Sequence, residues 1–192
     1  MTVPRRPSST AHVLDLWDEA EIARQLADAA LSTQTQALRS AEAPRGPGCY
    51  VLFYSGGHPL YRRAGASAVA MYIGAATSVA DRLGRHRVSL APVADLTIDD
   101  FLVVALPTRS IGQATYVEYL LAAELRPVWN DFRLRGFGSR AQGSIRSRGQ
   151  TRSPWDTLHP GRPWATGPYG HDVAELRRVA RDKVRGSATL RR

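Results

Sequence analysis

The chain is poor in cysteine and histidine and has no long apolar run, and each shortage excludes a class of protein. Cys49 is the only cysteine among 192 residues, which excludes both a disulfide framework and a zinc site built from thiolates. The five histidines are spread along the chain, so no histidine cluster is expected. No run of about 18 apolar residues occurs, and the opening MTVPRRPSSTAH has no apolar segment, so we expect neither a membrane span nor a secretory signal.

Lysine is nearly absent as well, and arginine carries the positive charge. The sequence has 26 basic and 17 acidic residues, a net charge of +9, and Lys183 is its only lysine. Residues 133–152 hold six arginines and no acid. Such a block indicates a polyanionic partner, with nucleic acid first and an anionic membrane surface second, while a solvated disordered tail is the plain alternative. Phe137 and the stretch SPWDTLHPGRPW supply anchors that a plain tail lacks, which favours nucleic acid.

Length, periodicity and turn residues predict one domain of the α+β class. β-Branched and aromatic runs predict strands at 48–55, 69–74 and 101–107, and apolar periodicity predicts helices at 12–31, from 77 or 78 to about 87, at 111–125 and at 171–186. We therefore expect a small antiparallel three-stranded sheet flanked by helices. Three parts of one compact domain are expected: an N-terminal arm and helix (1–46), the core (47–131) and a basic extension with a C-terminal helix (132–192).

A set of polar residues falls on the predicted core elements where one surface of the sheet would gather them. The set is Tyr50, Tyr72, Arg82, His86, Glu118 and Asn130. The tyrosines lie on paired strands, Arg82 and His86 are one helical turn apart, and Glu118 is at the edge of an apolar stripe, either half buried or exposed. Each is ordinary alone, because strand tyrosines usually pack and helix-edge charges usually face solvent. Their conjunction indicates a catalytic site.

The motifs on these elements resemble those of the GIY-YIG nuclease superfamily. The first motif stands here as GCY, with Cys49 where isoleucine is usual, and the second as an intact YIG. Arg82-x-x-x-His86, Glu118 and Asn130 match the family's Arg-His helix, metal-binding glutamate and downstream asparagine in order and spacing. The resemblance covers about residues 47–131 and implies the fold of a GIY-YIG nuclease core.

The segment between the two motifs is longer than the tight hairpin of many family members. This long segment is similar to the restriction-endonuclease branch. The stretches NDFRLRGFGSR and SPWDTLHPGRPWA look like those of the small type II enzymes that cut CCGCGG. The resemblance therefore implies hydrolysis of double-stranded DNA at a short palindromic site.

The resemblance, together with the chemistry of phosphodiester hydrolysis, suggests a role for each residue. Tyr50 is the candidate base, and because the ordinary tyrosine pKa is about 10, neighbouring cations would have to lower it. His86 would hydrogen-bond Tyr50 and accept its proton, and which of the two is the proximal base stays open. Arg82 would clamp the scissile phosphate and Tyr72 would bind phosphate or water. Glu118 would hold one Mg²⁺, which Mn²⁺ can replace.

Sequence specificity is expected from arginines that read guanine edges in the major groove. The candidates are Arg133, Arg135, Arg140, Arg146 and Arg148, and we expect Arg140→Ala to lose specificity without loss of fold only if it contacts a base. A palindromic target implies a homodimer or a larger homo-oligomer. The restriction interpretation also implies a cognate DNA methyltransferase and a place in the bacterial cytoplasm.

Two alternatives stay open at this point. One is a structure-specific repair or recombination nuclease of the same superfamily, which needs no palindrome. The other is a basic nucleic-acid-binding protein whose tyrosines only pack the sheet. The intact set of catalytic candidates argues against the second alternative, and the arginine-rich extension favours a restriction enzyme over the first. A nuclease of the class with paired acids and a catalytic lysine would have to use Lys183, which lies far along the chain from any such pair.

Overall fold

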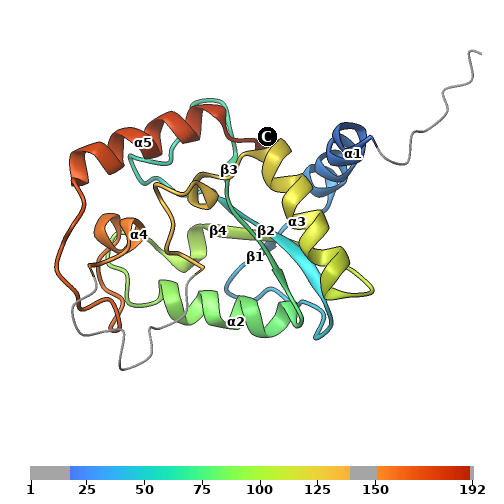
Figure 1. The fold of residues 1–192 in the computed structure, drawn as a ribbon, viewed down its shortest axis with the longest axis horizontal. Helices are drawn as coiled ribbons and strands as arrows, with labels where there is room; N and C mark the ends of the chain where they lie inside the picture. The colour runs from blue at the N-terminus through green and yellow to red at the C-terminus, as the bar shows by residue number, and fades with distance from the viewer. Residues whose placement is uncertain (1–17, 139–150, 191–192) are drawn as a thin grey trace, which may run out of the picture.

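The computed structural model describes residues 18–138 and 151–190, and its centre is a five-stranded antiparallel sheet (Figure 1). The strands are β1 (Gln36–Ala37), β2 (Gly48–Tyr54), β3 (Ala68–Ala76), β4 (Phe101–Pro107) and β5 (Thr189–Leu190), in the spatial order β1-β4-β2-β3-β5. The helices are α1 (Glu19–Ser32), α2 (Val79–Leu90), α3 (Ile111–Leu125), α4 (Pro154–Leu158) and α5 (Val173–Gly186). Short 3₁₀ turns span Ile98–Asp100 and Val128–Asn130.

The α+β class is confirmed, but the expectation of three strands is wrong, because two short strands extend the sheet. Strand β1 pairs with β4 at one edge, and β5 pairs with β3 at the other. Each added strand has only two residues, which is too short to produce an alternating hydrophobic pattern in the sequence. Because β5 comes from the end of the chain, the C-terminal region is tied to the same sheet as the predicted core.

The helices α2 and α3 begin where their capping residues predict. The Ser78 hydroxyl accepts a hydrogen bond from the Asp81 N–H, and the Ser110 hydroxyl accepts one from the Gln113 N–H. Helix α2 continues to Leu90 instead of ending near His86, so the histidine lies inside the helix.

Helix α1 is shorter in the described structure than the predicted helix at 12–31, because residues 12–17 lie outside the described residues. Its buried side is formed by three alanines, Ala23, Ala27 and Ala30. Elsewhere in α1, Ala20 is exposed and Leu26 is half-buried.

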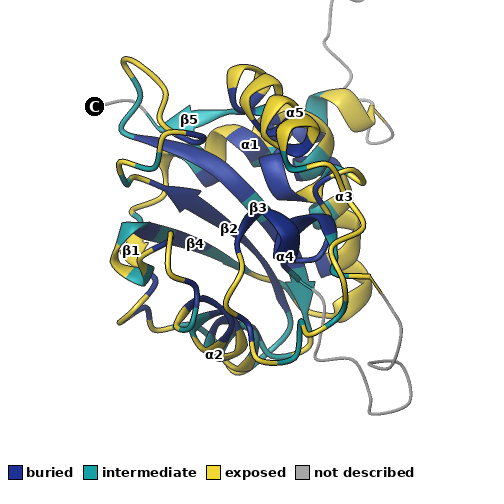
Figure 2. Cartoon of the chain, turned by 90° about the vertical axis from the view of Figure 1, so that its left-hand side faces the viewer, coloured by how far each residue is buried: buried dark blue, intermediate teal, exposed yellow. Residues whose placement is uncertain are grey.

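The sheet is covered on both faces, and β2 is buried along its whole length (Figure 2). Helices α1 and α3 pack on the face that carries Cys49, Val51 and Phe53. Helix α2 and the C-terminal helices pack on the opposite face, which carries Tyr50 and Leu52. Alternation along β2 therefore points Tyr50 toward α2.

A bulge in β3 directly precedes the second motif tyrosine. Leu52 faces Tyr72 and the next residue, Phe53, faces Ala70, so Met71 is an extra residue in β3. Because of this insertion, Met71 and Tyr72 both contact the α2-side core, while Ala70 and Ile73 contact the other. From Tyr72 onward the register is regular, with Leu52 opposite Tyr72 and Tyr50 opposite Gly74, so the two motif tyrosines lie on the same face of the sheet.

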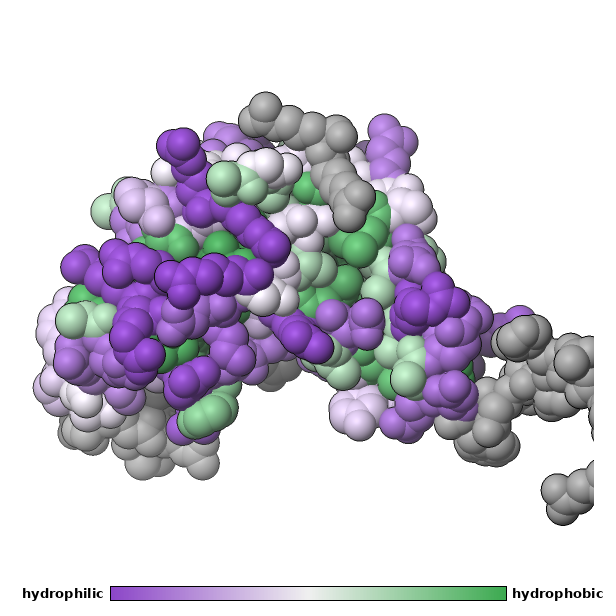
Figure 3. All heavy atoms as spheres, turned by 90° about the horizontal axis from the view of Figure 1, so that it is seen from above, coloured by the Kyte–Doolittle hydropathy of each residue, from purple (hydrophilic) through white to green (hydrophobic). Residues whose placement is uncertain are grey.

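Helix α5 covers the C-terminal side of the core and presents a charged outer surface. Leu176, Val179, Ala180 and Val184 are buried, and the view from above shows hydrophilic side chains gathered over this part of the molecule (Figure 3). Val173, the first residue of the helix, is half-buried. No helix among the described residues is both long and apolar enough to cross a membrane.

Candidate active site

Tyr50 and His86 form a buried hydrogen-bonded pair between β2 and α2. The Tyr50 hydroxyl oxygen is 2.7 Å from His86 Nε2, and the two residues are 0% and 2% exposed. Arg82 Nε donates a hydrogen bond to the same hydroxyl oxygen at 3.3 Å. Arg82 can only donate, so the Tyr50 hydroxyl is able to donate its own proton to His86 in the neutral tautomer that leaves Nε2 unprotonated. The arrangement is a preformed path for a proton from Tyr50 to His86.

Gly74 of the YIG motif makes room for the Tyr50 ring. In the sheet Gly74 lies directly opposite Tyr50, so side chains at the two positions would point to the same face. A Cβ at position 74 would collide with the Tyr50 hydroxyl and lie 2.7 Å from its Cζ. The glycine therefore allows the tyrosine to lie across β3 and reach α2.

Burial, more than charge, controls the protonation of the pair. It raises the pKa of Tyr50 well above its ordinary value, and the opposing effect of Arg82 is smaller. Burial, followed by the charges of Arg82, Arg162 and Arg85, lowers the pKa of His86 to about 3. The expectation that cations make Tyr50 acidic is therefore wrong for the free protein. Tyr50 is neutral at pH 7, and neutral His86 is ready to accept a proton.

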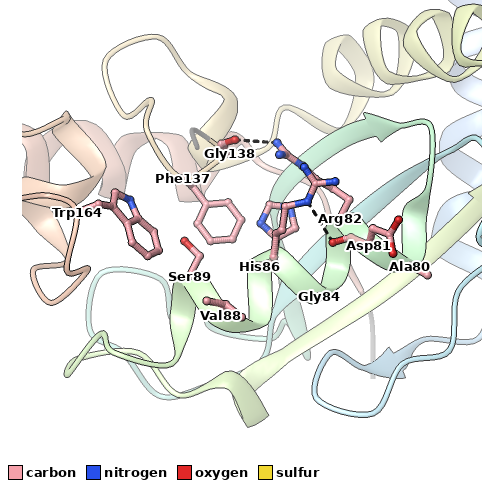
Figure 4. A pocket seen from close by; sticks show the side chains of 11 residues that line it. Ala80, Asp81, Arg82, Gly84, His86, Val88, Ser89, Phe137, Gly138 and Trp164 are labelled. Carbon is pink, nitrogen blue, oxygen red and sulfur yellow. Dashed lines mark hydrogen bonds between the residues drawn. The ribbon is translucent and has the colours of Figure 1, made fainter. Parts of the chain in front are cut away.

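Arg82 and Tyr72 line the accessible side of the pair. Arg82 is half-buried, and its Nη2 donates to the Gly138 carbonyl oxygen at 2.7 Å (Figure 4). The Tyr72 ring lies edge-on to His86, with ring centroids 5.4 Å apart. Burial raises the pKa of Tyr72, so this hydroxyl is neutral as well. In the free protein a backbone carbonyl thus holds the guanidinium that is the best candidate for a phosphate contact.

A pocket of about 560 Å³ opens beside these residues along α2 (Figure 4). Its lining includes Arg82, Arg85 and His86 from the helix, and Phe137 and Trp164 from the C-terminal region. Two arginines and aromatic surfaces suit an anionic ligand with an apolar part, such as a nucleotide.

Glu118 is half-buried on α3, which settles the alternative that the sequence left open. Burial raises the pKa of its carboxyl, against smaller opposing effects of the Ala75 backbone and Arg82. The charge of Glu118 contributes to the raised pKa of Tyr50 and of Tyr72, although α3 packs on the other face of the sheet. A partly desolvated carboxylate near a phosphate-binding arginine suits an oxygen-seeking divalent cation that keeps most of its waters, as Mg²⁺ does.

Asn130 is directed at the backbone of β3. Its Oδ1 accepts from the Ile73 N–H and its Nδ2 donates to the Ile73 carbonyl, both at 2.9 Å. The amide therefore pairs with the backbone of β3 next to Tyr72 as a neighbouring strand would. This geometry indicates that Asn130 stabilises the position of β3, the strand that carries Tyr72.

The predicted DNA-reading arginines are only partly within the described residues. Arg133 pairs with Asp131 at 3.1 Å, and the other carboxylate oxygen of Asp131 pairs with Lys183 at 2.6 Å. Arg135 is exposed beside the same region. Arg140, Arg146 and Arg148 lie outside the described residues.

A group of ionisable side chains away from the tyrosines shows that the expectation of scattered histidines is wrong. His58, Asp95 and His159 offer ligand atoms that lie within 4.8 Å of one another. His159 Nδ1 is 2.9 Å from Asp95 Oδ2, and the Tyr61 hydroxyl bonds its Nε2. They come from three separate loops, so no local spacing could have revealed them.

Hydrogen bonding decides what this group can hold. His58 Nδ1 accepts from the Leu60 N–H at 3.2 Å, so the proton of neutral His58 is on Nε2, which faces Asp95 at 3.4 Å. With both ring nitrogens engaged, His58 has no lone pair to offer a cation. The group therefore fits a hydrogen-bonded link between loops better than a metal centre.

The chain matches a known protein family. The family model described as the Eco29kI GIY-YIG domain matches residues 66–182, which is more than half of the chain. No curated protein sequence matches the chain. The matched residues include Tyr72, Arg82, His86, Glu118 and Asn130, while Tyr50 precedes them. The position of Tyr50 in the site therefore rests on its contacts with His86 and Arg82.

Proposed function

Because the chain belongs to the Eco29kI family of GIY-YIG nucleases, we propose that it is a type II restriction endonuclease that cuts double-stranded DNA at CCGCGG. The observation that carries the proposal is the buried hydrogen bond between Tyr50 and neutral His86, with Arg82 on the same hydroxyl oxygen. A buried tyrosine hydroxyl needs a hydrogen-bond partner in any case, but here a histidine and an arginine of the pocket lining both bond the same hydroxyl oxygen. The family makes the chain a nuclease domain, and the site suggests how it works.

In the proposed reaction, a water molecule attacks the scissile phosphorus while Tyr50 and His86 move its proton. The tyrosine oxygen takes the proton from the water as its own proton passes to His86 Nε2. Neutral His86 is the final acceptor, so Tyr50 need not be ionised beforehand. The lowered pKa keeps His86 unprotonated in the free protein, but it also makes the ring a weak base, so the transfer requires that the negative charge of the bound phosphate raise that pKa.

Arg82 and Tyr72 would bind the phosphate. The guanidinium exchanges its hydrogen bond with the Gly138 carbonyl for phosphate oxygens, and there it stabilises the charge that develops on them. The Tyr72 hydroxyl, on the same face of the sheet, donates to a phosphate oxygen or orients the water. Asn130 keeps the strand of Tyr72 in register.

Glu118 is the residue that would hold one Mg²⁺, which Mn²⁺ can replace. When bound, the cation stabilises the negative charge on the leaving 3′ oxygen and on the phosphate. The half-buried carboxylate would gain by this pairing, since burial alone raises its pKa. A single carboxylate suits one cation per site.

The palindromic target leads us to propose a homodimer or a larger homo-oligomer, with one active site facing each strand. A cognate methyltransferase would protect the host DNA, and a nuclease of this kind would work in the bacterial cytoplasm. Arg133, Arg135, Arg140, Arg146 and Arg148 are proposed to contact bases or phosphates. For Arg133 to do so, it would leave or share its pairing with Asp131.

The direct test uses unmethylated plasmid DNA with Mg²⁺ or with EDTA, read on a gel and mapped by sequencing the ends. The expected result is discrete fragments that need Mg²⁺ and end at CCGCGG, and a plasmid with a permuted site serves as control. A smear, or preference for branched DNA, would replace the proposal with a nonspecific or structure-specific nuclease. Uncut but retarded DNA would point to a nucleic-acid-binding protein.

A further inference from the structure

A buried arginine outside the tyrosine cluster holds the chain segment that covers His86. The Arg162 side chain is 1% exposed, and its Nε donates to Asp156 Oδ1 at 2.6 Å. Nη1 donates to the Ser89 hydroxyl of α2 at 3.0 Å and to the Phe137 carbonyl at 3.2 Å, and Nη2 donates to the Gly136 carbonyl at 3.0 Å. One guanidinium thus joins α2, α4 and the backbone before the active site.

The segment 136–138 that this arginine holds is in direct contact with the proposed catalytic residues. The Phe137 ring stacks on the His86 ring, with centroids 4.6 Å apart and planes at 7° (Figure 4). The next carbonyl, that of Gly138, accepts from Arg82. Three successive carbonyls are therefore bound by two arginines, Arg162 for the first two and Arg82 for the third.

The segment packs closely against the start of α4. Gly136 has φ +132°, a backbone conformation that favours glycine, and a Cβ there would lie 2.6 Å from Ser153 Cβ. Ser153 caps α4, and its hydroxyl donates to Asp156 Oδ2 at 2.6 Å, beside the oxygen that Arg162 binds. The cap, the ion pair and the segment thus form one connected unit.

A buried ion pair loses the hydration of both charged groups, and an apolar side chain in the same space would avoid this free-energy cost. Here the guanidinium does what an apolar residue cannot, since it binds two backbone carbonyls and a helix hydroxyl at once. Its charge also contributes to the lowered pKa of His86. The side chains that face His86 are Tyr50, Tyr72, Arg82, Arg85 and Phe137, and Arg162 lies behind the last of these.

We propose that Arg162 is a positioning residue of the nuclease site, which fixes the Phe137 ring on His86 and so keeps His86 oriented toward Tyr50. The catalytic part of this inference rests on the proposed function. The arrangement of His86 itself is a property of the free protein, and it can be measured without DNA.

The first experiment follows the ring nitrogens of His86 by NMR in full-length protein labelled with ¹⁵N-histidine, with the His86 signal identified by its loss in His86→Gln. Arg162→Gln should raise the pH at which His86 protonates by about one unit, because a positive charge and the packing of Phe137 are lost together. Arg162→Lys keeps the positive charge but lacks the planar set of N–H donors that binds the carbonyls and the Ser89 hydroxyl. It should therefore shift the titration less, while weakening the Phe137–His86 proton contacts.

The second experiment measures single-turnover DNA cleavage by the same variants. Both Arg162→Gln and Arg162→Lys should cut more slowly, roughly 10²-fold for a misplaced catalytic group, with DNA affinity unchanged. Arg87→Gln is the matched control. Arg87 is also on α2 and also donates to two backbone carbonyls, those of Leu38 and Ala41, but these lie on the other side of the helix. It should lower stability without changing the His86 titration or the cleavage rate of folded protein.

If Arg162→Gln does not fold, Phe137→Leu tests the same link, since it removes the ring that contacts His86 and leaves the backbone contacts of Arg162. It should raise the protonation pH of His86 and slow cleavage. An unchanged His86 titration in folded Arg162→Gln or Phe137→Leu would overturn the inference. Failure of the wild-type protein to cut DNA would instead overturn the proposed function and leave the NMR result standing.

Discussion

His86 should make the stability of the protein depend on pH in a way that one substitution removes. Its pKa is lowered to about 3 in the folded protein and is near 6.5 in an unfolded chain. Between these values the unfolded state binds a proton on His86 and the folded state does not. The stability contribution is therefore complete above pH 6.5 and is lost as the pH falls toward 3.

The size of the effect follows from the two pKa values. At pH 4.5 the solution is about 2 units below the unfolded pKa and still above the folded one, which corresponds to a loss of about 3 kcal/mol in the free energy of unfolding. His86→Gln keeps a hydrogen-bonding side chain but does not titrate. Urea unfolding at pH 7.5 and 4.5 should therefore show a pH difference that is about 3 kcal/mol smaller in the variant than in the wild type.

His171→Gln is the control, because it removes an exposed histidine that lies outside the site. Its pH difference should equal that of the wild type. If His86→Gln also retains the wild-type difference, His86 titrates normally in the folded protein, and the account of a buried, neutral proton acceptor is wrong.

Three further substitutions probe other parts of the site. Tyr50→Phe deletes the hydroxyl that links His86 and Arg82, and it should slow single-turnover cleavage on the order of 10²–10⁴-fold; full activity would move the base role elsewhere. Gly74→Ala places a Cβ against the Tyr50 hydroxyl and should cost about 1–3 kcal/mol in thermal or urea unfolding as well as activity, whereas wild-type behaviour would show that the ring can shift freely. Asn130→Ala leaves both Ile73 groups without their partner and should cost about 1–3 kcal/mol; hydrogen exchange at the Ile73 amide checks it, and unchanged protection would contradict the strand-holding role.

Local signals in the sequence were sufficient for the elements that carry the site. Strand 101–107 and helix 111–125 were predicted with their observed bounds, and Ser78 and Ser110 cap the helices as their spacing indicates. These features depend on residues a few positions apart. The position of Glu118 at the edge of an apolar stripe allowed either a half-buried or an exposed carboxylate, and the packing of α3 decides for the first.

Features that depend on distant contacts were not predictable in the same way. The bulge at Met71 follows from pairing with β2, and strict alternation along β3 gives no sign of it. The raised pKa of Tyr50 depends on burial by α2 and by other segments that come later in the sequence. A count of nearby cations therefore predicted a pKa shift in the wrong direction. Arg162 bonds Ser89 from 73 positions away, and no local pattern in the sequence singled it out. Its burial distinguishes it from the exposed arginines.

The most direct test of the proposed nuclease site is a matched pair of variants on α3, assayed on unmethylated DNA containing CCGCGG. Glu118→Gln removes the half-buried carboxylate, while Glu124→Gln changes an exposed glutamate of the same helix. The account predicts that Glu118→Gln still binds DNA but cuts on the order of 10²–10³-fold more slowly or not at all in Mg²⁺, and that Glu124→Gln cuts like the wild type. Wild-type cleavage by Glu118→Gln would contradict it.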